Sequence, residues 1–126
     1  MIAYLDTHVA VWLRAGLVER ISLAAKERIE ACDLLLSPMA FLELQYLFER
    51  KRIAVDAADA YVYLNATFGI ALCGLPFAAV ARAAAQTNWT SDPFDRIIVG
   101  QAQANHDAPL ITADTEIRRH YAGAVW

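Results

Sequence analysis

Hydrophobic and polar positions along this chain follow two alternating patterns. The first consists of short runs that are almost entirely apolar, which is typical of strands whose sheet is covered on both faces. Four runs of this kind, together with a weaker run at the end of the chain, predict strands at Ile2–Leu5, Leu34–Leu36, Ile70–Leu72, Leu110–Thr112 and Ala124–Trp126.

The second pattern fills the segments between these runs, where good helix formers recur at the helical spacing of 3.6 residues. It predicts helices at His8–Arg14, Leu23–Ala31, Pro38–Arg50, Ala57–Thr67, Phe77–Ala85 and Pro93–Asn105. Strands that alternate with helices indicate a parallel sheet with helices on both faces. The predicted fold class is therefore α/β, with a short central parallel sheet in a three-layer arrangement.

Two aspartates stand directly after predicted strands. Asp6 follows IAYL and Asp114 follows LITA, and each has a threonine nearby, Thr7 and Thr112 respectively. In an open α/β sheet, ligands bind beyond the carboxyl ends of the strands. Capping of the next helix is an equally good reason for an aspartate at such a position. Both interpretations stay open for each residue.

Glu43 occupies an unusual position in its predicted helix. The polar residues Gln45, Glu49 and Arg52 recur at helical spacing and mark the solvent side, while Glu43 lies on the other side among apolar residues. A carboxylate on an apolar face is unfavourable unless it is paired, neutralised or bound to a metal. We expect either a buried partner such as an arginine or a role in a functional site.

Asp92 and Asp95 flank the start of the last long helix, in the sequence Asp92-Pro93-Phe94-Asp95. Asp92 is predicted to be the N-cap, with proline at the first helical position. Asp95 is favoured at this end by the helix dipole, yet its spacing also places it over Ile98 and Val99, on the inward face. Asp95 is therefore a fourth candidate acid, and Asp92 is given a supporting role.

These four acids, Asp6, Glu43, Asp95 and Asp114, indicate one kind of chemistry. Carboxylate oxygens suit Mg²⁺ or Mn²⁺, whereas no histidine or cysteine in the chain has the spacing of a zinc site. A nucleophile elbow and a Gly-rich phosphate loop are also absent. The expected reaction is attack on a phosphodiester by a metal-activated water.

Length, composition and net charge exclude several classes of protein and remain compatible with a metal-dependent enzyme. The 126 residues fit a single domain spanning 1–126, and 58% hydrophobic content excludes a disordered chain. A formal net charge of −3 argues against a broad electrostatic nucleic-acid binder but allows an enzyme that concentrates its negative charge in one pocket. Cys32 and Cys73 are expected to be reduced thiols. With no secretory signal and no membrane span predicted, we expect a soluble cytoplasmic protein.

Four longer stretches follow one another along the whole chain: MIAYLDTHVAVWL, SPMAFLEL, SDPFDRIIVGQA and LITADTEIRRHY. Together they resemble the PIN-domain ribonucleases, and among these the VapC toxins of bacterial toxin–antitoxin pairs. The resemblance implies that Asp6, Glu43, Asp95 and Asp114 bind Mg²⁺ or Mn²⁺ and that Asp92 and Thr112 support the site. It also implies a homodimer, inhibition by a VapB-like antitoxin, and an RNA substrate such as tRNA or rRNA.

The chain departs from the family pattern at two places that are not metal ligands. Thr90 and Ser91 stand where some relatives have a histidine, and Gly100 replaces a common alanine. We expect them to alter the fit of RNA rather than the chemistry.

Binding of RNA requires cations near the acids. Arg96 adjoins Asp95, and Arg50 and Arg52 end the helix of Glu43, so these arginines are candidate phosphate contacts. They equally suit the role of ordinary cations at helix ends. Four aromatic residues could stack on bases, although packing is the simpler expectation for Tyr46, Phe48, Tyr61 and Trp89.

Three other functions compete with a nuclease. A catalytically inactive PIN-like module that only binds a partner would have lost an acid, and all four are present. A receiver or phosphatase domain needs a second acid close to Asp6, where Thr7 and His8 stand instead. A flavodoxin-like domain needs a phosphate-binding loop, which the sequence lacks. Metal-dependent RNA cleavage distinguishes the nuclease from all three.

Overall fold

The central sheet has five strands, all parallel, in the order β3-β2-β1-β4-β5. The computed structural model describes residues 1–126. The strands are β1 (Ile2–Leu5), β2 (Asp33–Leu36), β3 (Ala71–Leu72), β4 (Leu110–Ile111) and β5 (Ala124–Val125). The predicted α/β class with a parallel sheet is therefore confirmed, as is the weak strand at the end of the chain.

Seven α-helices and one 3₁₀ helix surround the sheet. They are α1 (Thr7–Ala15), the 3₁₀ helix (Val18–Arg20), α2 (Leu23–Ala31), α3 (Pro38–Glu49), α4 (Ala57–Phe68), α5 (Phe77–Ala84), α6 (Pro93–Ala104) and α7 (Thr115–His120). The six predicted helices are confirmed to within one residue at each end. The 3₁₀ helix and α7 were not among them, because segments of three and six residues are too short to show a helical period.

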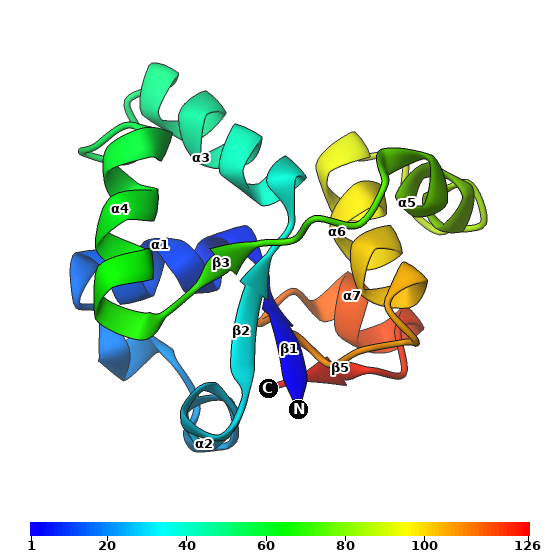
Figure 1. Cartoon of the computed structure of the whole chain (residues 1–126), viewed down its shortest axis with the longest axis horizontal. Coiled ribbons are helices and arrows are strands. Elements are labelled where there is room, and N and C mark those ends of the chain that lie inside the picture. The colour runs from blue at the N-terminus through cyan, green and yellow to red at the C-terminus, as the bar shows by residue number, and fades with distance from the viewer.

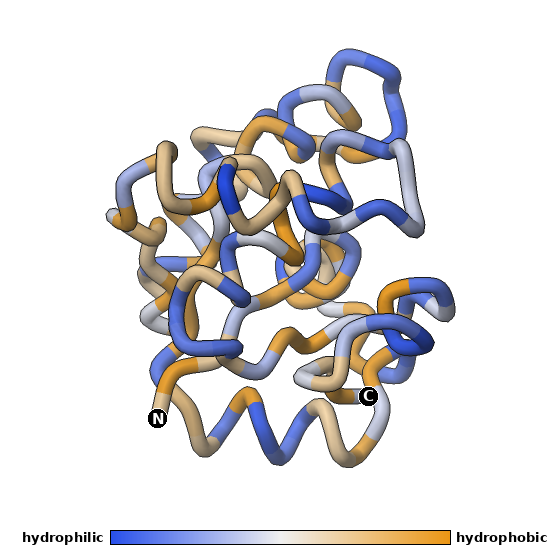
Figure 2. Tube along the Cα trace, turned by 90° about the vertical axis from the view of Figure 1, so that its right-hand side faces the viewer, coloured by the Kyte–Doolittle hydropathy of each residue, from blue (hydrophilic) through white to orange (hydrophobic).

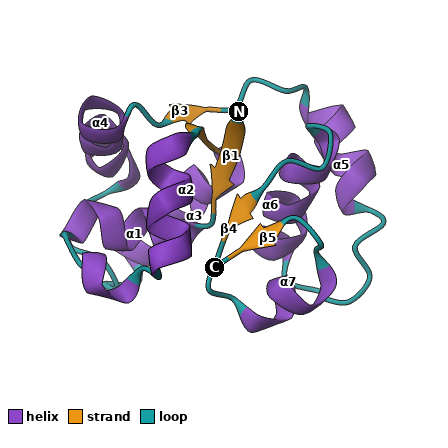
Figure 3. Cartoon of the chain, turned by 90° about the horizontal axis from the view of Figure 1, so that it is seen from below, coloured by secondary structure: helices purple, strands orange, loops and turns teal.

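The strand order explains the three layers. From β1 the chain adds β2 and β3 on one side, and then returns to add β4 and β5 on the other side of β1. Right-handed crossovers in opposite directions place their helices on opposite faces. Accordingly α1, α2 and α4 lie on one side of the sheet and α5, α6 and α7 on the other, while α3 extends over the carboxyl ends of the strands and packs against α6 (Figures 1 and 3).

Side chains at the helix ends account for the boundaries. Ser22 Oγ accepts the backbone N–H of Ala25 at 3.1 Å, and Asp56 Oδ1 accepts that of Asp59 at 2.9 Å, so both are N-caps. Helix α1 ends at Gly16, which has the left-handed φ of 74° that glycine adopts most easily. These start and stop signals are local, since each joins residues only a few positions apart.

A single core of 25 buried apolar residues fills the space between the sheet and the helices. Hydrophobic and hydrophilic residues alternate within the helices, so each helix turns one face to this core (Figure 2). Strand boundaries differ from expectation by one residue: β2 begins at Asp33, β3 begins at Ala71, β4 ends at Ile111 and β5 ends at Val125. Thr112 still donates its backbone N–H to Val125 O at 3.1 Å, just beyond the paired residues of β4. No helix combines the length and apolar character required to span a bilayer.

Candidate functional site

The site lies where the order of strand addition reverses, between β1 and β4. Strands β1 and β4 are neighbours, with Leu5 paired to Ile111, and their connections run to opposite faces. Their carboxyl ends form the crevice in which parallel α/β sheets bind ligands. Asp6 follows β1 directly and Asp114 follows β4 by three residues, so both predicted strand-end acids reach this crevice.

A threonine hydroxyl joins the two strand ends. Thr112 Oγ1 donates to Asp6 Oδ2 at 2.6 Å and accepts the backbone N–H of Asp114 at 3.0 Å. Asp6 Oδ1 accepts the backbone N–H of Thr7 at 2.8 Å. The Asp6 side chain is 6% exposed and Thr112 is fully buried. The Asp6 carboxylate is thus held in one orientation, as a side chain must be when it acts in a site.

Both strand-end aspartates also cap helices. Asp6 is the N-cap of α1, and Asp114 Oδ1 accepts the backbone N–H of Ile117 at 2.9 Å as the N-cap of α7. The two interpretations of these residues are therefore compatible. An ionised carboxylate has about four acceptor positions, so capping leaves Asp114 Oδ2 free for another partner.

Glu43 and Asp95 approach the same crevice from two helices. Glu43 lies in the second turn of α3 and Asp95 in the first turn of α6, and both are half-buried. A buried hydrogen bond from Ser37 Oγ to Gln101 Oε1, 3.0 Å long, fastens the start of α3 to α6. No arginine, lysine or histidine forms an ion pair with either acid. The alternative of a buried arginine partner for Glu43 is therefore wrong.

The acids of the crevice lie within electrostatic reach of Asp95. The pKa of Asp95 rises to about 7, first because burial disfavours its charge and then because Asp92, Asp6, Asp114 and Glu43 are all near enough to repel it. The structure therefore brings together the four predicted acids around Asp95, with Asp92 as a fifth.

The pKa values of the Glu43 and Asp6 carboxyls are raised as well. Burial is the largest cause of the raised pKa of each carboxyl, and Asp6 adds repulsion to Glu43. The Thr7 hydroxyl and the exposed His8 oppose the rise at Glu43. Thr7 Oγ1 is buried close enough to Glu43 to stabilise the charge of that carboxylate, yet it forms no hydrogen bond within 3.5 Å. The crevice thus contains an unsatisfied polar atom as well as unneutralised acids.

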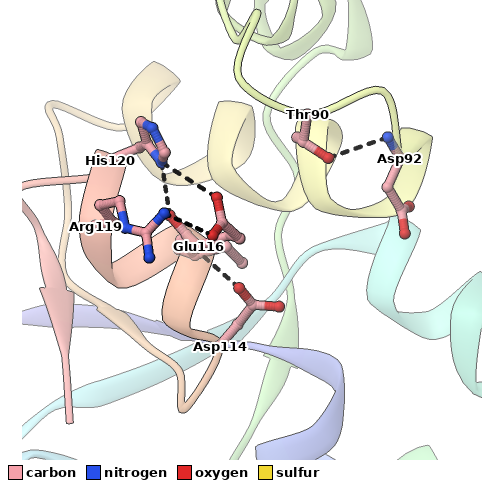
Figure 4. A network of polar contacts seen from close by, with 7 residues as sticks. Thr90, Asp92, Asp114, Glu116, Arg119 and His120 are labelled. Atoms are coloured by element: carbon pink, nitrogen blue, oxygen red, sulfur yellow. Dashed lines mark hydrogen bonds and ion pairs between the residues drawn. The ribbon is translucent and has the colours of Figure 1, made fainter.

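The supporting residue Asp92 lies at the rim. Its Oδ1 accepts the backbone N–H groups of Phe94 and Asp95 at 2.8 and 3.4 Å, so it is the N-cap of α6 as predicted. Its own N–H donates to Thr90 Oγ1 at 3.2 Å (Figure 4). Asp92 therefore sets the start of the helix that carries Asp95.

Outside the crevice, one acid does have cationic partners. The two ion pairs in the structure both involve Glu116, which contacts Arg119 at 2.9 Å and His120 at 3.9 Å within α7 (Figure 4). The ring of His120 also stacks on that of Trp89, with centroids 4.8 Å apart and planes nearly parallel at 4°. This stack joins α7 to the loop before α6, so it supports both Asp92 and Asp114.

The donor set fits a hard divalent cation. Carboxylate oxygens of Asp6, Glu43, Asp95 and Asp114 are the ligand type that Mg²⁺ and Mn²⁺ prefer, and the buried Thr7 hydroxyl close to Glu43 adds a further oxygen. No three histidine, cysteine, aspartate or glutamate side chains are arranged to hold an ion together. Mg²⁺ keeps several waters and often uses only one or two carboxylates, so a tighter cluster is not required.

The three candidate phosphate-binding arginines have different surroundings. Arg96 is engaged: its Nε and Nη2 donate to the carbonyl oxygens of Ala84 and Ala85 at the end of α5, at 3.3–3.4 Å. Arg50 lies over the ring of Tyr46, and Arg52 lines a separate hollow beside α1. Arg96 shares α6 with Asp95, and Arg50 is the C-cap residue of α3, the helix of Glu43.

Two features of the site were not predicted as functional. Thr7 stood beside Asp6 in the sequence, and its place at the first position of a helix after a strand-end acid was the signal that could have identified it. Ser37 and Gln101 gave no such signal, since their hydrogen bond spans 64 positions.

Comparisons with known proteins agree with this geometry. A family model described as "PIN domain" matches residues 3–123. The chain is 33% identical over 118 residues to Ribonuclease VapC22 of Mycobacterium tuberculosis (strain ATCC 25618 / H37Rv), covering 92% of this chain and 89% of that protein. The fold is similar to a chain in the crystal structure of VapBC2 from Rickettsia felis bound to a DNA fragment from their promoter. That match has a TM-score of 0.62 at 14% sequence identity and covers 98% of this chain and 96% of the other.

Proposed function

The chain belongs to the PIN domain family, and on this basis we propose that it is an endoribonuclease acting as the toxin of a VapBC-type toxin–antitoxin pair. One observation carries the proposal: buried and half-buried acids gather at the switch point of the sheet without any cation to neutralise them. Such an arrangement is unfavourable for the fold alone. The name of the Mycobacterium tuberculosis relative, a ribonuclease, supports RNA as the substrate.

We propose Mg²⁺ or Mn²⁺ as the cofactor, with Asp6, Glu43, Asp95 and Asp114 as the residues that would hold it. When bound, such an ion lowers the pKa of a water molecule and stabilises negative charge on the phosphoryl oxygens. Thr7 and Thr112 orient Asp6 through hydrogen bonds of 2.8 and 2.6 Å. The apolar surroundings of Glu43 and Asp95 limit access of bulk water, which strengthens their attraction for a cation.

The test is RNA cleavage by the Asp6→Asn variant. Asparagine keeps the shape of the side chain and an acceptor for the Thr112 hydroxyl but removes the charge, so cleavage is expected to be abolished while the fold remains. Asp33→Asn is a matched control, because Asp33 is exposed and begins β2, at the edge of the sheet opposite the crevice.

The control is expected to cleave RNA like the unmodified chain, and EDTA is expected to stop both. Full activity of Asp6→Asn contradicts the assignment of this site. A chain that cleaves no RNA with either metal, but still binds an antitoxin, would instead be the inactive partner-binding module.

We propose a VapB-like antitoxin as one partner and assign it to the hollow beside α1. This hollow has a volume of about 310 Å³ and mostly apolar walls, with Arg14, Arg20 and Arg52 at its border and no acid paired to them. Its charge suits a partner that brings apolar and acidic side chains together. Copurification with the protein encoded by a neighbouring small reading frame tests this assignment. The Arg14→Glu variant is expected to lose the copurifying partner.

A homodimer is proposed through a second surface. A hollow of about 370 Å³ between α3 and α5 is lined mostly by apolar residues, and no charged residue lines it. Leu42 and Phe77 beside it are 54% and 65% exposed. Apolar contacts without charge suit a symmetric interface between two copies. Sedimentation velocity is expected to give twice the chain mass of 13.9 kDa, and a monomer at micromolar concentration would contradict this.

We place the protein in the cytoplasm, where tRNA and rRNA, the substrates proposed here, are found. Both cysteines, Cys32 and Cys73, are free thiols, which is consistent with a reducing compartment.

A further inference from the structure

The apolar hollow of about 370 Å³ between α3 and α5 has a rim and a floor. The rim carries Leu42 and Phe77, the two exposed side chains that the proposed second copy would cover. The floor is α6, which packs against both other helices and contributes Ile97 and Gln101 (Figure 1). Gln101 is only 2% exposed, so the floor lies well below the surface that another protein chain would contact.

Gln101 is the one polar side chain that lines this hollow, and half of its amide group lacks a partner. Its Oε1 accepts the Ser37 hydroxyl at 3.0 Å. Its Nε2 is buried and has no acceptor within hydrogen-bond distance. Buried N–H groups are nearly always paired, because an unmade hydrogen bond is unfavourable away from bulk water. The fold therefore leaves one buried donor at the floor of the hollow unsatisfied.

Ser37 fixes which way round the Gln101 amide lies. Ser37 Oγ accepts the backbone N–H of Met39 at 3.1 Å, and its single hydrogen is donated to Gln101 Oε1. The opposite orientation of the amide would leave both that hydrogen and Oε1 without partners. Oε1 is therefore turned to Ser37, and Nε2 is the atom left to meet a ligand in the hollow.

The surroundings of Nε2 select the chemistry of such a ligand. No charged residue lines the hollow, so an ionised group would be buried there without a counter-charge. Water is a poor partner, because buried waters make about three hydrogen bonds and Gln101 is the only polar side chain available. A volume of about 370 Å³ is in the range of small-molecule pockets. An uncharged apolar molecule with one acceptor oxygen meets all these conditions.

We propose that the floor of this hollow is a binding site for a small, uncharged, apolar molecule that carries a carbonyl oxygen, with Gln101 Nε2 as the donor to that oxygen. The site is separate from the acid crevice and goes beyond the proposed ribonuclease function. Its ligand would nevertheless lie against both helices that carry half-buried acids. On α3 it would contact Met39, four residues before Glu43. On α6 it would contact Ile97, two residues after Asp95.

The first experiment titrates the uniformly ¹⁵N-labelled chain with acetophenone and, in parallel, with α-methylstyrene. The two probes have the same shape, but α-methylstyrene has a CH₂ group in place of the carbonyl oxygen. Acetophenone is expected to bind about fivefold more tightly, the gain that one hydrogen bond to a buried donor provides. Its titration is also expected to shift the side-chain NH₂ signals of Gln101. Gln103 is the internal control, because it lies on the same helix but does not line the hollow.

The second experiment compares Gln101→Met with Gln103→Met. Methionine keeps the length of the side chain but removes the donor, so Gln101→Met is expected to lose the preference for acetophenone. Gln103→Met is expected to retain it. Circular dichroism and the melting temperature show whether each variant is folded, since Gln101→Met also loses the bond to Ser37. The first experiment needs no variant, so it tests the site even where Gln101→Met does not fold.

Three results overturn the inference: no saturable binding of acetophenone at millimolar concentration, equal affinity of the unmodified chain for both probes, or Gln101 signals that stay in place while other signals move. A fourth concerns the second copy. If Gln101→Met is folded but sediments as a monomer where the unmodified chain is a dimer, Nε2 is a contact between copies instead. None of these measurements involves RNA cleavage, so the proposed function stands or fails separately.

Discussion

At the scale of single residues, the site depends on how Asp6 is held. Thr112 Oγ1 is a donor to Asp6 and an acceptor from the backbone of Asp114, so a single hydroxyl sets the spacing of two strand ends. Removing it leaves a buried carboxylate oxygen without a partner. Residues that orient ligands in this way often influence activity by one to two orders of magnitude.

Thr112→Val is therefore expected to lower kcat for RNA cleavage by about 10- to 100-fold, while Thr112→Ser keeps most of it. Valine has the same shape but no hydroxyl, so the Asp6 carboxylate loses its donor and its fixed orientation. Metal-titrated cleavage rates measure the effect. Equal activity of the valine and serine variants would show that the hydroxyl is not required.

The raised pKa of Asp95 makes the stability of the metal-free protein depend on pH. Its pKa is 3.8 in a model peptide and about 7 in the folded chain, so between these values the folded state holds a proton that the unfolded state has lost. Stability from this group is therefore greatest near pH 4 and decreases as the pH rises toward 7.

We expect the melting temperature of the metal-free chain to fall by several degrees more between pH 5 and pH 7.5 than that of Asp95→Asn. Asparagine has no proton to lose, so the difference between the two melting curves isolates this carboxyl. Thermal unfolding followed by circular dichroism at matched ionic strength measures it. Parallel curves for the two proteins would contradict the raised pKa.

At the scale of secondary-structure elements, α6 is positioned by close contact with α5. A Cβ placed on Gly100 would lie 2.9 Å from both the Cβ and the backbone nitrogen of Ala84. The two helices can therefore approach this closely only with glycine at position 100. The departure from the family pattern noted in the sequence thus affects packing at the base of the helix that carries Asp95.

Gly100→Ala is expected to destabilise the fold by about 1–2 kcal/mol, although alanine is the better helix former. The added methyl meets backbone as well as side-chain atoms of α5, so one helix must shift. Denaturant unfolding measures the change. Gly74→Ala is the control, because a Cβ there meets nothing within 4 Å. A Gly100→Ala variant that is more stable than the unmodified chain would show that the contact can relax.

At the scale of the whole molecule, the fold tolerates a concentration of acids that it does not neutralise itself. The molecule as a whole has a formal charge of only −3, yet Asp6, Glu43 and Asp95 all have raised pKa values. The unfavourable charge is therefore local. A cation bound at this point relieves it in the folded state alone.

Addition of Mg²⁺ or Mn²⁺ is accordingly expected to raise the melting temperature. At a metal concentration about one hundred times Kd, the stabilisation is about 2.7 kcal/mol, or roughly 5–15 °C for a domain of this size. Differential scanning calorimetry with and without millimolar metal measures it, and Asp6→Asn should respond much less. No shift in the unmodified chain would exclude a specific divalent site.

The sequence predicted those features that depend on residues close together along the chain. Apolar runs predicted the strands, the helical period predicted six helices, and Asp92 was predicted to be an N-cap, because each of these depends on residues within a few positions. The short helix α7 was missed for the same reason, since six residues are too few for a period. The four acids were identified from strand ends, helix faces and the resemblance to a known family.

The tertiary structure alone decided which residues meet. The order β3-β2-β1-β4-β5 places Asp6 beside Asp114, and the antiparallel contact of α3 with α6 brings Glu43 toward Asp95. It also showed Arg96 bound to the end of α5 and Lys51 in a left-handed conformation. Strand pairing and helix packing join residues far apart in sequence, and no local pattern encodes them. Residue types and helix caps were therefore determined by the sequence, while the acid crevice and its raised pKa values arise only from folding.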